Sequence, residues 1–560
     1  MKQTKLILFA AILVSALFWS CKDTTQLTNA IPADAIVVIH VDTKSLLTKA
    51  DYKPFDNKLI KEAFEKEKNR GSERNKAMTE KMEEFLKDPN SSGIDLIHDC
   101  YMYVGSTSMG VIWGMKDVGK FKEVLTKTFD VPEEMIKEED GISTVDLSSM
   151  AKIGWAKDKV LIITASTSAM YGFGNNDGPD LMELLKKQLK QTEKESINAN
   201  KAFAEFVKDK KDISVFYSYS NIPGLWGNMA SRMIGAFNNQ FTDVFGKLSD
   251  QIKGVNAAGF VSFEKGEIVT ESKFYYDSPE AEKRIADLSG KLTQELKGDQ
   301  IKYLAEKPLF LAAMGINGGG IYDYLTDLGL MQLVEDIAGS NLNEMGIDLK
   351  SLISNVDGDI TVSINGVKTV MKKSYYSDYE YPSTEPEFSV FADLKDAKPT
   401  WDLIKNKVKE VAAKEEMTDS TLVEIDENTY SFKMDEGMKG YAGIKGNTIY
   451  ITNSEAIYKN ISTATDGKND FASLAKGKTS LIFGSLGSLR TMLEDELQSN
   501  AGALELATKG FDLLGDYSFA SDKNLNSKGK IVINDNSANS LAVICKYIDS
   551  VITYAIEKNL

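Results

Sequence analysis

The sequence predicts an α+β protein made of two tandem, internally duplicated halves, each with a mostly antiparallel sheet and helices packed on one face. Two observations predict this class. Five segments recur in the same order along the chain, and in each half groups of short strand patterns joined by hairpin turns are separated by helical regions. Hairpin-connected strands form antiparallel sheets, whereas a parallel sheet needs a regular βαβ alternation that neither half shows.

The clearest recurrence is a strand pattern, a Lys-Asp pair and a helical pattern. It runs from Ser108 to Leu125 around Lys116-Asp117, and from Phe388 to Ile404 around Lys395-Asp396. The other matched pairs are Gly93–Leu96 with Gly346–Leu349, Lys152–Ser166 with Gly440–Ser454, Lys211–Trp226 with Gly477–Met492, and Gly266–Val269 with Gly529–Val532. Similar segments in one order indicate an old duplication with loop insertions.

Each half begins with a strand pattern, Ala35–Asp42 in the first and Pro308–Ile316 in the second. Lys152–Ser166 and its counterpart each predict two short strands around a turn. Apolar residues at three- and four-residue spacing predict helices over Phe121–Thr128, Asp180–Lys194, Pro279–Leu296 and Ser537–Lys558. We therefore predict a first α+β half over residues 31–300 and a second over 301–560.

The first twenty residues predict a secretory signal peptide. Lys2 and Lys5 give a positive start, Leu6–Trp19 is an unbroken run of apolar and small residues, and Ser20 precedes a cysteine. As a helix, Leu6–Trp19 would rise only about 21 Å, less than the roughly 30 Å hydrocarbon core of a bilayer. Residues 1–20 are therefore expected to be cleaved and not to span a membrane.

The cysteine after the predicted cleavage point resembles the lipobox of bacterial lipoproteins, so we expect Cys21 to be the lipid attachment site. An ordinary signal peptide followed by an incidental cysteine is the alternative. Residues 21–30 (CKDTTQLTNA) are polar and without periodicity, which predicts a flexible tether. No other apolar run approaches eighteen residues, so we expect the lipid alone to hold the mature chain at the membrane.

Charge and cysteine usage fit an exported protein. The formal charge of −16 becomes −18 once Lys2 and Lys5 are removed, which opposes binding to nucleic acid and to anionic lipid surfaces. Solubility is the simplest reason for this charge, and a cationic partner is the alternative. Beyond Cys21 only Cys100 and Cys545 remain. We expect two buried free thiols, with a disulfide between them as the alternative.

No catalytic or metal-binding motif is recognisable. The only histidines are His40, in the first strand pattern, and His98, just before Cys100. A serine triad would need a G-x-S-x-G elbow, and a zinc site would need three or four ligands at close spacing. We predict no catalytic residue, no metal ligand and no cofactor, and interpret His40 as a partly buried strand residue. A glycosidase-like carboxylate pair stays open, because the 82 acidic residues form many pairs at unknown distances.

Three further segments have partial motif character. Gly477–Thr479 resembles the end of a phosphate-binding loop, but the glycine expected five positions earlier is Ala472 and a strand pattern follows. Gly315–Gly320 follows a strand pattern without dinucleotide-loop spacing, so we predict a turn into a helix. Asn175–Gly178 has the composition of a calcium loop without its ligand pattern, which favours a turn.

One segment has no counterpart in the first half. Between the second-half strand patterns lies MKKSYYSDYEYPSTEPE, in which Tyr375, Tyr376, Tyr379 and Tyr381 alternate with small and acidic residues. Tyrosine-rich loops provide rigid amphipathic contact area at protein or glycan interfaces. The favoured interpretation is an extended exposed hairpin whose tyrosines pack on their own sheet.

These patterns together carry a resemblance. Ile31–Leu47 (IPADAIVVIHVDTKSLL), followed by the repeated strand, Lys-Asp and helix unit, resembles the large Bacteroidota lipoproteins of domain-of-unknown-function family 4836. KDKVLIITASTSAM and GNTIYITNSEAIY are similar to a broader group of exported α+β proteins, family 3352. Neither family implies a known activity, and only Cys21 can be carried over as a site residue.

The leading hypothesis is a non-enzymatic, lipid-anchored protein of the cell envelope, at the outer membrane, that acts in binding or assembly. The expected partners are the membrane through the lipid and an envelope protein or glycan, but not nucleic acid. Lys22-Asp23 partly resembles a surface-export signal, which leaves the periplasmic and outer faces both open. A carrier of an apolar ligand is the first alternative, and a carboxylate-dependent envelope hydrolase is the second.

Overall fold

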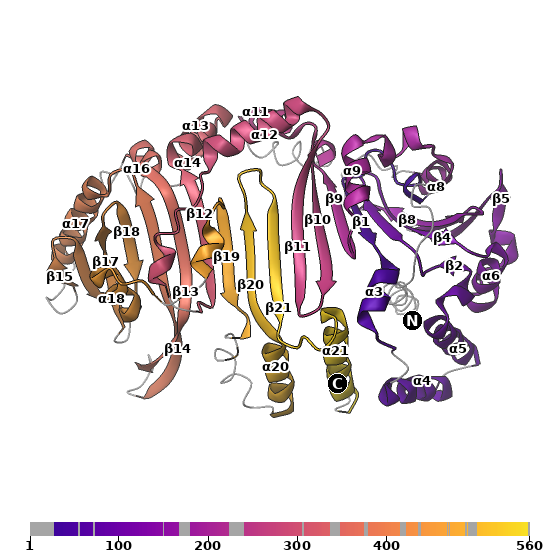
Figure 1. Cartoon of the computed structure of the whole chain (residues 1–560). Coiled ribbons are helices and arrows are strands. Elements are labelled where there is room, and N and C mark those ends of the chain that lie inside the picture. The colour runs from indigo at the N-terminus through magenta and orange to yellow at the C-terminus, as the bar shows by residue number, and fades with distance from the viewer. Residues whose placement is uncertain are drawn as a thin grey trace. The chain divides into compact units, whose positions relative to one another are not determined.

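The structure is a computed structural model of the whole chain (Figure 1). It describes residues 27–53, 57–70, 73–148, 151–166, 180–222, 240–304, 307–335, 348–373, 379–414, 422–434, 438–467, 469, 471–487, 490 and 501–557. The chain forms two compact units, which are described separately. Unit 1 comprises residues up to Thr242, Ser249–Glu282 and Asp535–Leu560, and unit 2 comprises Asp243–Leu248 and Lys283–Asn534.

Unit 1 is built on one antiparallel sheet with the order β5–β6–β7–β8–β4–β3–β1–β9–β10–β11, and a short strand β2 pairs with β4. Its strands are β1 Val37–Val41, β2 Ile94–Asp95, β3 Cys100–Val104, β4 Ser108–Met115, β5 Lys137–Glu139, β6 Ile142–Ser148, β7 Ala151–Trp155, β8 Lys159–Ala165, β9 Ile213–Ser218, β10 Val255–Glu264 and β11 Glu267–Tyr276.

The helices of unit 1 lie between groups of strands. They are α3 Thr43–Ala50, α4 Lys58–Arg70, α5 Glu73–Lys87, α6 Val118–Glu123 continued by a π-helical turn Val124–Thr128, α8 Leu181–Lys190, α9 Lys201–Asp209, and the last helix of the chain, α21 Ser540–Glu557. Polar caps fix several starts. The Asp180 side chain accepts from the N–H groups of Met182 and Glu183 at the start of α8, and Asn200 accepts from Phe203 N–H at the start of α9.

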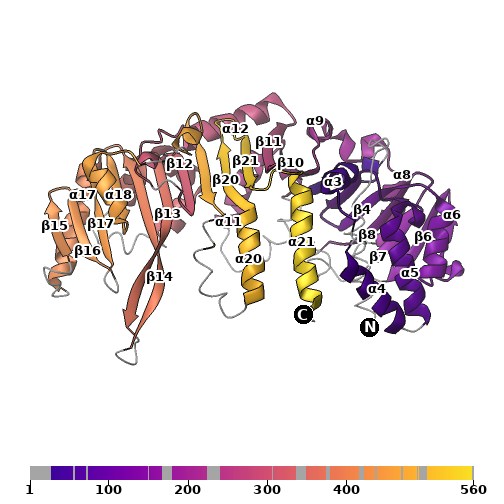
Figure 2. The same cartoon turned by 60° about the horizontal axis from the view of Figure 1, so that its bottom comes forward.

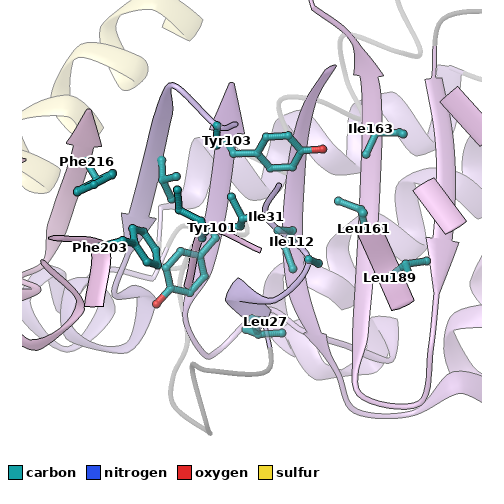
Figure 3. Close-up of a cluster of buried hydrophobic side chains, with 14 of the residues drawn as sticks. Leu27, Ile31, Tyr101, Tyr103, Ile112, Leu161, Ile163, Leu189, Phe203 and Phe216 are labelled. Carbon is teal, nitrogen blue, oxygen red and sulfur yellow. The ribbon is translucent and has the colours of Figure 1, made fainter. Parts of the chain in front are cut away.

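Helices cover both faces of the unit 1 sheet. Alternate residues of each strand point to opposite faces and pack in two separate cores. One core joins strand residues such as Tyr101 and Ile112 to α8 and α9, and Figure 3 shows this cluster. The other joins the neighbouring residues Cys100 and Trp113 to Leu46 of α3 and to α6. The prediction of helices on one face is therefore wrong, whereas the α+β class is confirmed.

The segment predicted as a flexible tether is partly folded. Leu27 and Ala30 are buried in the first core, and the Asn29 side-chain oxygen accepts from Asn198 Nδ2 at 2.7 Å. The tether prediction is thus wrong for residues 27–30, because Leu27 supplies apolar area that packs with the following Ile31. Residues 1–26, including Cys21, lie outside the described residues.

Unit 2 contains one antiparallel sheet with the order β15–β16–β17–β18–β14–β13–β12–β19–β20–β21. Its strands are β12 Phe310–Asn317, β13 Val356–Lys373, β14 Glu380–Leu394, β15 Leu422–Asp426, β16 Thr429–Lys433, β17 Lys439–Lys445, β18 Thr448–Thr452, β19 Ser480–Ser485, β20 Leu514–Ser521 and β21 Ser527–Ile533. Its helices are α13 Gly318–Leu328, α14 Met331–Val334, α16 Leu349–Asn355, α17 Ala397–Lys414, α18 Glu455–Thr463 and α20 Ala501–Leu513.

The core of unit 2 lies on one face of its central strands. Leu311 and Ala313 of β12, Phe391 of β14 and Leu481 of β19 are buried there against residues of α18 and of the short 3-10 helix Phe471–Ala475. On the opposite face α17 covers the outer strands, where Trp401 contacts Tyr430 of β16 with ring centroids 6.0 Å apart. The opposite face of the central strands has no such cover from the described helices.

The two strand orders correspond strand for strand. The β5–β8, β4–β3–β1 and β9–β11 groups of unit 1 have the same sequence order and the same antiparallel neighbours as β15–β18, β14–β13–β12 and β19–β21 of unit 2. Four of the five segment pairs matched in the sequence fall on corresponding strands wherever the structure describes both copies. The pair Gly93–Leu96 and Gly346–Leu349 does not, because Ile94–Asp95 form β2 whereas Asp348 caps and Leu349 begins helix α16. This correspondence supports the predicted duplication.

The unit boundaries differ from the predicted halves. Helix α21 follows the last strand of the second half but belongs to unit 1, where it packs on α3 and its Leu541 contacts the second core. Helix α12 (Pro279–Leu292) follows the last strand of the first half, yet its Lys283–Leu292 portion belongs to unit 2. The predicted boundary at residue 300 is wrong, because α21 of the second half belongs to unit 1 and most of α12 of the first half belongs to unit 2.

The predicted helices are confirmed at their positions, including Ser537–Lys558, which the structure forms as Ser540–Glu557. Both remaining cysteines are free thiols, as expected. Cys100 is buried, but Cys545 is only half-buried, and Ile548 and Ile552 on the same face of α21 are exposed. The expected burial of that helix face is therefore wrong.

Candidate functional site

The central strands of unit 2 present a continuous row of apolar side chains on the face opposite their core. Ladder pairing places Ile451 opposite Val390, Val390 opposite Val362, Val362 opposite Ala312, and Ala312 opposite Ile482. Side chains on one face of paired strands are direct neighbours, about 4.5–5.5 Å apart at Cβ. A second row beside it contains Ile449, Ala392, Ile360 and Met314. We call these two rows the open face.

The open face is accessible. Met314 is 48% exposed, Val362 40%, Ile482 37% and Ile451 36%, although all four stand on the central strands of a sheet. These four residues stand on four strands, and Val390 and Ala392 of β14, between Ile451 and Val362, are half-buried. Single exposed apolar residues are common on protein surfaces, whereas apolar rows that are accessible on several neighbouring strands are typical of interaction sites.

The same row exists in unit 1 but is less exposed. It contains Ile162, Val111, Met102, Ile39 and Val215, and Val111 precedes the Lys-Asp pair by five residues just as Val390 does in unit 2. All five side chains are half-buried, and four of them pack against the second core. That core contains apolar side chains from helices of unit 1, namely Leu46 of α3, Phe121 of α6 and Leu541 of α21. Apolar side chains of helices thus cover this row in unit 1, whereas the corresponding row of unit 2 is the open face.

Beside the open face, β13 and β14 continue past the neighbouring strands as a two-stranded ribbon (Figure 2). We call Gly366–Lys373 with Glu380–Glu387 the ribbon. The corresponding hairpin of unit 1, β3–β4, turns within residues 105–107. The ribbon is therefore the tyrosine-rich insertion detected in the sequence, and the expected extended hairpin is present.

The ribbon exposes apolar and aromatic side chains at its far end. Tyr379 is 68% exposed, Met371 53% and Tyr381 40%. These values contradict the interpretation that both tyrosines pack on their own sheet. Tyr375 and Tyr376 lie outside the described residues. An isolated two-stranded ribbon is only marginally stable in water.

The two histidines have separate environments in unit 1. His40 is fully buried, not partly as predicted, and its Nε2 lies 2.9 Å from Asp99 Oδ1. Lys210 Nζ donates to Asp99 Oδ2 at 3.2 Å and to the Tyr101 hydroxyl at 3.0 Å. Burial lowers the pKa of His40, so the ring is neutral near pH 7 and Nε2 carries the proton that it shares with the carboxylate.

Charge pairing outweighs burial at Asp99. Burial by itself raises the pKa of this carboxyl, but hydrogen bonds from His40 and Lys210 bring the pKa below its ordinary value. A neutral imidazole beside a carboxylate resembles a general base. However, the carboxylate, the lysine and the hydroxyl satisfy one another, and the imidazole is only 1% exposed. The cluster fits a structural role. Burial also lowers the pKa of His98, to about 4.

A buried carboxylate pair occurs in unit 2, which bears on the hydrolase alternative. Asp359 Oδ1 and Oδ2 accept from Lys297 N–H at 3.0 Å and Gly298 N–H at 2.7 Å. Asp393 Oδ1 accepts from Gln300 Nε2 at 2.8 Å, and Oδ2 accepts from Asp359 N–H at 3.2 Å. Burial raises the pKa of Asp359. Three of the four oxygens accept from the Lys297–Gln300 turn and the fourth accepts from Asp359 N–H, so the pair is occupied in holding the fold together.

The surface also contains a depression of about 600 Å³ between α5 and the π-helical turn of unit 1. Its lining includes Glu80, Lys81, Glu84 and Lys127, a charged set without the apolar character that a carrier site requires. Among the described residues no group of His, Cys, Asp and Glu side chains is arranged to hold a metal ion.

The weaker motifs have structural explanations. Strand β19 begins directly after Gly477–Thr479, and α13 begins directly after the strand that contains Gly315, as predicted. Asn175–Gly178 lies outside the described residues. The open face itself was not predicted. Its signal was present in β12, whose FLAAM run is apolar at consecutive positions, as expected for a strand with two apolar faces.

Known proteins were compared by solved structure, by sequence and by family. Solved structures titled crystal forms IV and I of TP0453 align with a TM-score of 0.22 at 7% and 8% identity, covering 44% and 45% of this chain and 79% and 80% of theirs. No curated protein matches. Within the described residues, no helix has the length and apolar character needed to cross a membrane. Residues 27–541 match the family described as "Domain of unknown function (DUF4836)", so the chain belongs to that family.

Proposed function

We propose that this protein is a non-enzymatic, lipid-anchored component of the cell envelope, at the outer membrane, that binds another protein through the open face of unit 2. The observation that carries this proposal is the apolar row from Ile451 to Ile482 across five strands, in which Ile451, Val362 and Ile482 are exposed and Val390 and Ala312 are half-buried. The anchor at Cys21 rests on the sequence, as does the resemblance to exported Bacteroidota lipoproteins and to family 3352.

Unit 1 indicates what kind of surface the partner presents. The same row is covered there by apolar side chains of helices, among them Leu46 and Leu541. Because the two sheets share one strand order, a helix with an apolar face is the shape that this surface accommodates. Burying the four most exposed residues of the open face would contribute several kcal/mol at about 25 cal/mol per Å² of apolar area, part of which offsets the entropy lost on association.

A site-specific crosslink tests the open face. A photoreactive phenylalanine analogue placed at Val362 is expected to form a discrete protein adduct in intact cells of the source organism. The same analogue at Val118, which is 37% exposed on unit 1, is the matched control and should form none. Ile482→Lys should reduce the Val362 adduct at least tenfold, since a lysine in a buried apolar contact costs more than about 1.4 kcal/mol. Adducts with lipid only, or equal adducts at both sites, would contradict the proposal.

The anchor is tested by Cys21→Ser. This substitution removes the thiol that is acylated, so the variant should leave the membrane fraction for the soluble fraction, because a folded chain without acyl groups has little membrane affinity. Cys545→Ser is the control and should fractionate as the parent protein does. Unchanged fractionation and electrophoretic mobility of Cys21→Ser would show that position 21 carries no lipid.

A further inference from the structure

The two outer edges of the ribbon differ in their backbone hydrogen-bonding groups. Strand β13 pairs with β12 as far as Ile364, opposite Phe310, and beyond it the described ladder pairs β13 with β14 alone. Strand β14 pairs with β18 from Ser389 onward. Over the ribbon, each strand therefore has one side without a described partner strand.

Two prolines determine which backbone groups face outward. Pro382 stands opposite Met371, and Pro386 stands opposite Val367. Proline is tolerated in a strand where the missing N–H would point away from the ladder. Met371–Pro382 and Val367–Pro386 are therefore non-hydrogen-bonded, or wide, pairs of the antiparallel ladder. The pair Thr369–Thr384, which lies between them, is a wide pair as well. In such pairs the N–H and C=O groups of both residues point to the outer edges.

The two edges consequently differ. On β14, two of the three outward positions are prolines, so that edge has lost two of its three donors. On β13, Val367, Thr369 and Met371 keep every outward N–H and C=O group. Natural sheets block open edges with proline, because an unblocked edge pairs with another strand. The ribbon blocks one edge and leaves the other available.

Charge indicates the composition of a strand that would fit. The β13 segment carries Lys368, Lys372 and Lys373 and no acidic residue. Its existing neighbour β14 places Glu385 opposite Lys368 and Glu380 opposite Lys373. A strand on the free edge would meet Lys368 and Lys372, which share one face, and on the alternate face Val367, Thr369 and Met371. Lys372 is already ion-paired with Glu385 of β14.

We propose that the outer edge of β13, over Val367–Met371, accepts an extended segment of a partner protein as an added β-strand in which acidic residues alternate with apolar ones. Main-chain hydrogen bonds supply the binding, and the lysines supply the preference for acidic side chains. This site is separate from the open face and does not depend on the function proposed for it.

The experiment uses the full-length mature protein and a fluorescent heptapeptide, acetyl-Glu-Val-Glu-Thr-Glu-Val-Glu-amide, with fluorescence anisotropy as the readout. The peptide is expected to bind, and the same peptide with lysine in place of glutamate should bind at least tenfold more weakly. N-methylation of alternate residues on the edge that faces β13 removes the donors that strand addition needs. This change should also weaken binding at least tenfold, at about 1 kcal/mol per lost hydrogen bond.

Thr369→Pro and Thr384→Pro form a matched pair on the protein. Each removes one outward N–H of the same wide pair, the first on the β13 edge and the second on the β14 edge. Thr369→Pro should abolish peptide binding, whereas Thr384→Pro should leave it within twofold, and circular dichroism of both variants verifies that the fold is kept. Equal binding to both variants, or binding that survives N-methylation, would overturn the proposal. Concentration-dependent association of the protein alone that Thr369→Pro abolishes would assign the edge to a second copy and overturn it as well.

Discussion

Gly320→Ala is expected to destabilise unit 2 by about 3 kcal/mol or more. Helix α13 begins with three glycines after Asn317, whose side chain caps it by accepting from Gly320 N–H at 3.1 Å. A Cβ on Gly320 would lie 1.8 Å from the Lys291 carbonyl oxygen and 2.8 Å from its carbon. Both are backbone atoms, so α12 and α13 would have to separate and no side-chain rotation relieves the overlap.

The adjacent glycine provides the control. A Cβ on Gly319 would meet only the Asn317 Oδ1 and Lys395 Nζ atoms, both at 3.6 Å, which is ordinary contact. Gly319→Ala should therefore be neutral or stabilising by up to about 1 kcal/mol, the difference in helix propensity between the two residues. Hydrogen exchange in peptides from β12 and α13, followed with denaturant unfolding, distinguishes the two variants. Similar stability of both would show that α12 does not approach α13 as closely as the structure has it.

Local patterns in the sequence were sufficient to predict most elements and the fold class. The Lys-Asp pairs at 116 and 395 mark the end of β4 and β14, because a strand that ends in a capped helix start needs a side chain like Asp117, which accepts from Lys120 N–H. Period-two and period-3.6 patterns gave the strands and helices, since each depends on residues close in the chain.

Long-range packing could not be predicted in the same way. The apolar pattern of α21 specifies a helix but not the sheet that it covers, and the structure places it on α3, about 490 residues away in sequence, where Tyr52 donates to Asp549 at 2.6 Å. Likewise Val111 and Val390 have the same position in the repeat and similar neighbours. Whether a helix of the same chain covers that position depends on the other elements of each unit, not on the strand.

The polar cluster of unit 1 was also missed, for a related reason. His40 was recognised as a strand residue, but its partner Asp99 directly precedes β3, 59 residues away, and Lys210, which donates to Asp99, lies in the segment before β9. Sequence spacing does not reveal such a triad of histidine, carboxylate and lysine. Only the ladder register, which places His40 opposite Tyr101, brings these residues together.

Asp99→Ala should destabilise unit 1 by about 3 kcal/mol, because it leaves the buried His40 Nε2 and the mostly buried Lys210 ammonium without their common acceptor. Asp99→Asn keeps an oxygen that accepts from one partner but removes the negative charge, so its stability should fall between those of the parent and the alanine variant. The control is Lys190→Ala, which removes an exposed ion pair with Asp140 at the end of α8 and should leave stability unchanged.

Tryptophan fluorescence can follow this series, because Trp113 and Trp155 are buried in unit 1, and exchange in β1 and β3 peptides gives the local change. The expected order of unfolding midpoints is parent, Asp99→Asn, Asp99→Ala, with Lys190→Ala equal to the parent. A parent-like midpoint for Asp99→Ala would mean that water reaches the cluster and solvates the neutral imidazole and the Lys210 ammonium. The structural role of the cluster, which depends on its closure to water, would then be contradicted.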